Sequence, residues 1–316
     1  MTRRFALLFA LLFTASCGFS WDPGAGAPNQ TLHLTVTASP SGAAAFPTSI
    51  TDFQGRSVAI SKRPERIVSI GPSNTEFLFA LGAGDRVVGD DDFSDQPAAA
   101  ATKDHVGGVK VNLEKVVSLK PDLIITVKFS DGTIEALSQT AATVLVVDPQ
   151  GLADVTRTAS MIGKAIGADG DGLAKDIQAK LDAVKAMTAS APKLKVFDEE
   201  DASDLTKLYT VGPGSFLNDL ITLAGGTNIA AAAKSAYPTI STEEVVKADP
   251  EVIVLDDAAF GTSVDSVAKR PGWAALSAVK NGRVYPLDAN LMSRPGPRVA
   301  DAATALAKLV HPELFK

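Results

Sequence analysis

The sequence is poor in cysteine, histidine and net positive charge. Its 316 residues include one cysteine and three histidines, His33, His105 and His311, which lie far apart in the chain. One cysteine excludes an internal disulfide framework, and the scattered histidines do not indicate a metal site. The formal net charge is −6, from 36 acidic and 30 basic residues, without the basic stripe of a nucleic-acid binder. We therefore expect no resident metal, no cofactor and no nucleic-acid partner.

The sequence also lacks the common catalytic motifs. Gly71-Pro72-Ser73 and Gly212–Ser215 look like glycine-rich phosphate turns, but the Lys-Ser/Thr of a P-loop does not follow either of them. No serine stands in a nucleophile elbow. The acidic runs Asp90–Asp92 and Asp256-Asp257 are more typical of solvated loop tips than of acid–base pairs. We predict that the protein is not an enzyme, with an extracytoplasmic enzyme kept as an alternative.

The first 17 residues have the pattern of an export signal. Arg3 and Arg4 precede an apolar run, 5–13, that is too short to span a bilayer as a helix. Cys17 follows small residues and resembles the acylated cysteine of a bacterial lipoprotein; the alternative is an ordinary cleaved signal. Residues 18–47, rich in Gly, Ala, Pro, Ser and Thr, predict a flexible tether. We expect an extracytoplasmic protein, in the periplasm or on the outer face of the cytoplasmic membrane, with a lipid anchor.

Strand and helix patterns alternate from Arg66 onwards. Apolar residues make up 46% of the chain, which is ample for a core. Short runs of branched apolar residues between helical segments predict βαβ units and a mainly parallel sheet. We place an N-terminal α/β lobe at 48–150, a long connecting helix at 151–188, which Gly167 to Gly172 can interrupt, and a C-terminal α/β lobe at 189–316.

One stretch of this pattern occurs twice. Residues 114–125 and 243–254 each follow a residue of the N-cap type, Asn112 or Ser241, and each gives a short helix, a proline stop and a branched apolar strand. The repeat predicts two similar lobes. Glu114 and Glu243 occupy equivalent first-turn positions. The helix dipole alone accounts for such residues, and a matched pair of acidic contacts for a two-fold partner is the functional interpretation.

Parallel sheets of this kind bind ligands outside the carboxyl ends of their strands. Two such edges facing each other across a connecting helix predict a cleft for a large, partly apolar ligand. For Arg294, in a loop stiffened by two prolines, we favour ligand contact over pairing with a surface acid; for Arg298 we favour a structural role at the start of the last helix. The candidate ligand-binding residues are Ser73, Asn74, Phe93, Lys128, Phe129, Tyr209, Tyr237, Asp256, Met292 and Arg294.

Several of these segments resemble one known family. Residues 66–76, 112–124, 223–228 and 282–285 are similar to the iron-chelate and cobalamin substrate-binding proteins of ABC importers, and the match runs from about Phe46 to Phe315. The resemblance implies two Rossmann-like lobes joined by one long helix, no catalysis, and a two-subunit permease with its ATPase as partners. It also implies that Glu114 and Glu243 pair with permease arginines. We expect a monomer that binds a metal chelate.

The resemblance also bears on the ligand. The loop from Asn290 to Arg298 is similar to that of cobalamin-binding members, in which an arginine matching Arg294 approaches the corrin side chains, although an acidic residue of that loop is Asn290 here. A tyrosine of haem-binding members, near Val109, is absent. We therefore predict cobalamin or another corrinoid, with a ferric siderophore second and haem third. A sensor or chaperone that does not take part in transport is a further alternative.

Overall fold

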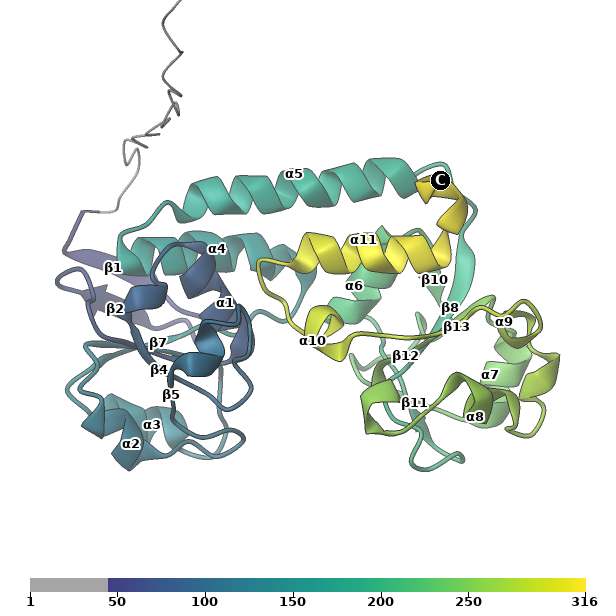
Figure 1. Cartoon of the computed structure of the whole chain (residues 1–316), viewed down its shortest axis with the longest axis horizontal. Helices are drawn as coiled ribbons and strands as arrows, with labels where there is room; N and C mark the ends of the chain where they lie inside the picture. Colours follow the sequence, from purple (N-terminus) through teal and green to yellow (C-terminus); the bar gives the residue numbers. More distant parts are fainter. Residues whose placement is uncertain (1–44) are drawn as a thin grey trace, which may run out of the picture. The chain divides into compact units, whose positions relative to one another are not determined.

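The chain is shown as a computed structural model in Figure 1, in which residues 45–316 are described. The predicted signal peptide (1–17), the lipidation at Cys17 and residues 18–44 of the predicted tether lie outside the described residues. Across 45–316, each helix is too short or too polar to cross a membrane.

The first part of the chain builds a parallel sheet with the strand order β5-β4-β3-β6-β7. Two of its inner strands, Ile67–Ile70 and Leu123–Thr126, are fully buried runs, since a parallel sheet is covered on both faces. An antiparallel hairpin, β1 with β2, precedes it. The strands are β1 (Thr48–Thr51), β2 (Ser57–Ile60), β3 (Ile67–Ile70), β4 (Val87–Asp90), β5 (Asp104–His105), β6 (Leu123–Thr126) and β7 (Thr143–Val146).

The second part builds a separate parallel sheet with the order β10-β8-β12-β13, beside a small antiparallel pair of β9 with β11. These strands are β8 (Leu194–Glu199), β9 (Leu208–Tyr209), β10 (Gly226–Asn228), β11 (Thr239–Ile240), β12 (Val252–Leu255) and β13 (Val284–Pro286). The predicted fold class, two α/β lobes with mainly parallel sheets, is therefore confirmed.

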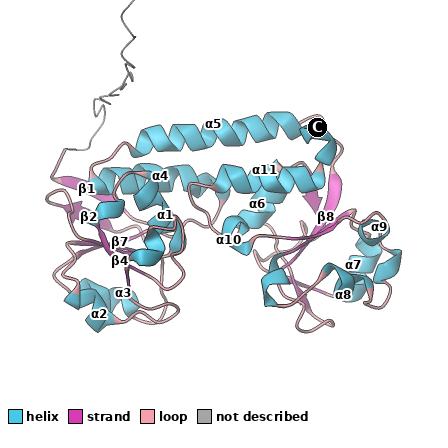
Figure 2. Ribbon diagram, viewed as in Figure 1, coloured by secondary structure: helices cyan, strands magenta, loops and turns pink. Residues whose placement is uncertain are grey.

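Helices cover both sheets (Figure 2). They are α1 (Pro72–Ala80), α2 (Leu113–Ser118), α3 (Thr133–Ser138), α4 (Leu152–Ile166), α5 (Gly170–Thr188), α6 (Phe216–Leu223), α7 (Thr242–Ala248), α8 (Val264–Ala268), α9 (Ser277–Lys280), α10 (Ala289–Met292) and α11 (Val299–Val310). Helix α5 packs on α4, α6 and α11, and one hydrophobic core runs through these helices from the first sheet to the second. Two smaller cores fill the other faces of the sheets.

The segment 151–188, predicted as a connecting helix that Gly167 to Gly172 can interrupt, is two helices, and the break falls within that interval. Helix α4 ends at Gly167, which adopts a left-handed conformation with φ 68°, and Asp169 caps the start of α5 through the backbone N–H of Gly172. Gly163 and Gly170 let the two helices touch, because a Cβ on Gly170 would lie 2.2 Å from the carbonyl oxygen of Ala159. The 19-residue helix α5 is therefore the long helix that leads into the second sheet.

The repeat found in the sequence extends to individual hydrogen bonds. Asn112 caps α2 and Ser241 caps α7. Lys120 and Asp249, which end these helices, are the non-glycine residues with positive φ in the described chain, both at 48°.

The strands that follow the two helices are held alike as well. The Asp122 carboxylate accepts from the backbone N–H of Arg66, and Glu251 accepts in the same way from Lys195. The side chains of Arg66 and Lys195 donate in turn to the last carbonyls of α2 and α7. The two units are therefore one structural motif used twice.

Candidate functional site

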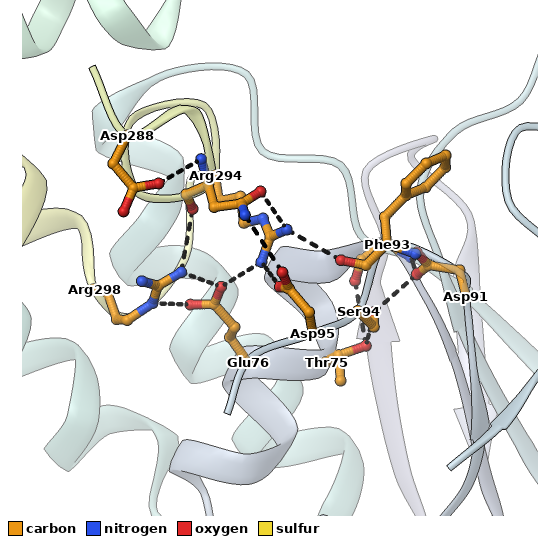
Figure 3. Close-up of polar contacts among 11 residues, drawn as sticks. Thr75, Glu76, Asp91, Phe93, Ser94, Asp95, Asp288, Arg294 and Arg298 are labelled. Carbon is orange, nitrogen blue, oxygen red and sulfur yellow. Dashed lines mark hydrogen bonds and ion pairs between the residues drawn. The ribbon is translucent and has the colours of Figure 1, made fainter. Parts of the chain in front are cut away.

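A loop of the second lobe meets the first lobe through a set of ion pairs (Figure 3). This loop connects α10 to α11 and carries Arg294 and Arg298. Its partners, Glu76 on α1 and Asp95 after β4, follow strands of the first sheet. The contact therefore joins segments that follow the carboxyl ends of strands in both sheets, where parallel sheets place their ligands.

Glu76 is the buried centre of this network. Its side chain is 3% exposed, and Arg298 donates to both carboxylate oxygens, from Nη2 to Oε1 at 2.7 Å and from Nε to Oε2 at 2.8 Å. These bonds raise the pKa of Arg298 above its usual value. A bidentate pair of this kind fixes orientation as well as charge, so it holds the start of α11 against α1.

Arg294 lies beside this pair, and both terminal nitrogens of its guanidinium are engaged. Nη1 is 2.6 Å from Oδ1 of Asp95 and 3.5 Å from Oε1 of Glu76. Nη2 donates to the carbonyl oxygen of Phe93 at 3.1 Å and to Oδ1 of Asn290 at 2.8 Å. The pairing with an acid that we weighed for Arg294 therefore exists, and contact with a ligand stays a prediction.

The loop that receives Arg294 is held by a buried carboxylate, Asp91. Its Oδ2 accepts from the backbone N–H of Gly71 at 2.6 Å and from the hydroxyl of Ser94 at 2.9 Å, and its Oδ1 accepts from the N–H of Phe93. Asp90, also buried, contacts His105 at 2.9 Å, and burial raises its pKa to about 7. The prediction of solvated loop tips is thus wrong for Asp90 and Asp91, because both side chains are buried and the groups they contact belong to the protein.

Carboxylates also gather at the edge of the second sheet. Alternation along β8 and its continuation puts Val196, Asp198 and Glu200 on one face, and Asp256, after β12, follows Val254 on the same face. Asp256 and Asp257 are buried as well, so these loop tips too are not solvated. Oδ2 of Asp256 accepts from the hydroxyl of Ser293 at 3.2 Å, beside Arg294.

These carboxyl groups are perturbed by burial and by one another. Burial, then the charge of Asp256, raises the pKa of Glu200 to about 7. The pKa of Asp198, a fully buried group, is raised by burial and by its acidic neighbours, and neither of its oxygens has a hydrogen-bond partner. Within residues 45–316, no three His, Cys, Asp or Glu side chains are placed to hold a metal ion.

The structure brings only some of the predicted ligand residues together. Arg294 contacts Phe93 directly, and Ser293 links the adjacent loop to Asp256. Tyr237 is 60% exposed and lies within electrostatic reach of Asp256. Ser73 is half-buried next to the Arg294 loop, with its Cα 3.7 Å from a Cβ built on Gly296.

Other predicted residues lie inside the lobes or apart from the network. Asn74 is buried and donates to the carbonyls of Ile70 and Val147, and Met292 is buried in the core. Lys128 and Phe129 follow β6, and Phe129 packs against the core. Tyr209, on β9, is partly exposed. The positions of these five residues neither establish nor contradict the predicted ligand contacts.

The residues that sequence reasoning missed are Glu76 and Asp95. Glu76 had a signal, because it lies one helical turn after Ser73 on α1 and so shares its face. Asp95 had none, since its partner Arg294 is far away in the sequence. Glu114 and Glu243 are exposed in the first turns of α2 and α7, as predicted from the capping pattern. Within residues 45–316, neither carboxylate takes part in a hydrogen bond or an ion pair.

Comparisons with known proteins agree with this architecture. A family model described as "Periplasmic binding protein" matches residues 67–291. The chain is 35% identical over 320 residues to an ABC transporter substrate-binding lipoprotein, YvrC, of Bacillus subtilis, covering 98% of this chain and 97% of the relative. It is 31% identical to a vitamin B12-binding protein of Vibrio cholerae, over 75% of this chain and 86% of the relative.

The solved structures that are similar to this chain include the vitamin B12-binding protein BtuF of Vibrio cholerae. Its TM-score is 0.67 with 28% identity, over 80% of this chain and 98% of that one. A haem-binding protein, BhuT, shares the fold with a TM-score of 0.72 over 80% of this chain and 100% of that one. The two sheets, the helix between them and the matched sequence define a two-lobed solute-binding protein. The chain belongs to the periplasmic binding protein family and is a substrate-binding protein of an ABC transporter, which works outside the cytoplasm with a permease and an ATPase.

Proposed function

We propose that this protein captures cobalamin or another corrinoid between its two lobes and delivers it to the permease of an ABC importer. The similarity to vitamin B12-binding proteins across three quarters of the chain carries this proposal. The Arg294 loop supports it, because residues that follow strands of both sheets meet there.

The charges around the loop favour a corrinoid over an anionic chelate. Arg294, the cation best placed to receive an anion, is already paired with Asp95 and Glu76. Asp256 and Glu200, two acids whose pKa values are raised by burial, offer no cation to an anionic chelate. Haem carboxylates and many ferric siderophores are anionic, so they would be repelled, whereas the carboxamides of a corrinoid donate N–H groups to carboxylates.

For docking, we propose that Glu114 and Glu243 meet cationic groups on the two permease subunits. Their support is the structural identity of the two units that carry them. We further propose that the chain acts as a monomer and carries a lipid anchor at Cys17. The name of the YvrC relative, a lipoprotein, supports the anchor.

Titration of the purified protein with cyanocobalamin, haemin and a panel of ferric siderophores tests the ligand. We expect cyanocobalamin to bind with a dissociation constant in the micromolar range or below, and haemin to bind more weakly. The same titration of the Arg294→Met variant tests whether the loop contributes to ligand binding. Arg157→Met is its control, because Arg157 is a cation that stacks on Phe53 away from the loop. Absence of corrinoid binding at micromolar concentration contradicts the corrinoid assignment. Tight binding of a ferric siderophore in its place would establish the second candidate, and ligand turnover would establish an enzyme.

A further inference from the structure

Apolar side chains stay exposed next to Glu114. Leu113 and Val117 lie one turn apart on α2 and are 36% and 55% exposed. Residues three or four positions apart share a helix face, so Val117 lies beside Glu114 as well as beside Leu113. A contiguous exposed apolar patch with a polar rim is typical of an interaction surface.

This patch continues into a groove of about 760 Å³ between α2 and α3. Leu113, Val117 and Pro121 line the groove from α2 and the turn after it, and Ala136, Ala141 and Ala142 line it from α3 and the turn after it. Lys120, Gln139 and Thr140 complete the lining as its polar part. A second hollow, of about 400 Å³, shares Leu113 and is lined by Glu114. The carboxylate of Glu114 and the apolar groove therefore adjoin each other.

The second lobe repeats the central part of this arrangement. Val246 is the repeat equivalent of Val117, comes three residues after Glu243, and is 36% exposed. Val116 and Val245, the preceding residues, are both fully buried. Each short helix therefore buries one valine in its lobe and leaves the next one in water beside a first-turn glutamate.

We propose that Val117 and Val246, together with the groove beside Val117, are the apolar part of the surface that docks the permease. This inference rests on the proposed function. It assigns each lobe a two-part contact, a carboxylate for a cation of the permease and a valine for one of its apolar side chains. Two matched contacts on one chain fit a partner built from two similar subunits.

The net charge of the chain favours the permease over a second copy of this chain. A symmetric dimer would place the same surface on both sides of the contact. Two copies that each carry a net charge of −6 repel each other, although Lys110 lines the same hollow as Glu114 and Lys120 lines the groove. A partner with cationic groups is attracted to the same surface.

Binding of the purified protein to the permease–ATPase complex in nanodiscs tests this proposal, with Val117→Asp, Val246→Asp and Met187→Asp compared. Met187 is a matched control, since it is 42% exposed and lies on α5, which packs on α4, α6 and α11. We expect Val117→Asp to weaken binding by about tenfold or more, and Val246→Asp to weaken it less because Val246 is less exposed. Met187→Asp stays within about twofold of the unchanged protein.

Two further measurements separate the outcomes. If Glu114→Gln weakens the complex and Val117→Asp does not, the apolar contact is overturned and the proposed function stands. No complex with the unchanged protein would overturn the proposed function itself. Unchanged cyanocobalamin affinity in Val117→Asp supports a docking role, and a dimer of the free protein that Val117→Asp dissolves would assign the patch to a second copy.

Discussion

The two lobes share one framework and differ in what they place at the edges of their sheets. The capping residues, the left-handed helix ends and the strand-start hydrogen bonds are equivalent in both. The acids at the edge of the second sheet, Asp198, Glu200 and Asp256, correspond by the same repeat to Ser69, Gly71 and Val127 in the first lobe. The framework is therefore common, while the ionisable groups that face the candidate site are specific to each lobe.

The largest effect we predict concerns the ion pair that joins the lobes. Arg298→Met leaves the buried Glu76 carboxylate facing only Arg294, whose nearest nitrogen is 3.5 Å away. Breaking a buried pair on one side is costly, so we expect the free energy of unfolding to fall by about 3 kcal/mol. Urea denaturation followed by circular dichroism measures this change.

The matched control is Arg294→Met, which leaves the bidentate pair of Glu76 with Arg298 intact. We expect it to cost about 1 kcal/mol, because its main partner, Asp95, is half exposed. Equal losses in the two variants would show that Glu76 is not the centre of the network.

The second prediction concerns the acids that only the second lobe carries. The pKa of Glu200 in the folded chain is about 7, above the usual value of 4.5, so the folded state holds a proton that the unfolded chain has released. Its contribution to stability is therefore full below about pH 4.5 and lost as the pH rises through 7. Glu200→Gln removes a difference of the order of 2 kcal/mol between pH 5 and pH 8.5.

Thermal unfolding at several pH values measures this difference. Asp198, Asp256, Asp257 and Tyr237 lie within electrostatic reach of Glu200, and these titratable groups remain in the variant. Asp90→Asn is the control from the first lobe, since the pKa of Asp90 is also about 7 but its partner is His105. A pH profile that Glu200→Gln leaves unchanged would contradict the raised pKa.

The smallest effect we predict is a difference in stability change between the two copies of the repeat, when the residue that ends each helix is replaced by glycine. Lys120 and Asp249 both have a φ of 48°, which glycine adopts without the Cβ penalty. We expect Lys120→Gly to stabilise the chain by about 0.5–1 kcal/mol. Asp249→Gly should destabilise it by a similar amount, because the Asp249 carboxylate accepts from the N–H and the hydroxyl of Ser277.

Chemical denaturation of both variants tests this opposition. The same sign for both changes would mean that the backbone conformation outweighs the side-chain contacts of Asp249. Opposite signs would confirm that the two lobes keep one backbone geometry by different means.

Much of the architecture could be predicted because its signals are local. The cap at Ser241, the proline after Asp249 and the branched strand that follows lie within a few residues of one another. The break at Gly167 was visible as a possibility, but only the close contact of Gly163 with Gly170 makes α4 and α5 pack together.

The candidate site was less predictable because its contacts join distant parts of the chain. Arg294 was found from its loop, whereas its partners Glu76 and Asp95 are about 200 positions away. The burial of Asp91 depends on the N–H of Gly71, a contact that spacing does not reveal. Pairing of charges across lobes follows from the folded geometry and not from residue pattern.

A crystal structure of the protein with cyanocobalamin tests the central claim most directly. We predict that the corrin lies between the carboxyl edges of the two parallel sheets, touching residues of both lobes and the Arg294 loop. Corrinoid density bound to one lobe alone, or no corrinoid in crystals grown with an excess of it, would contradict the account.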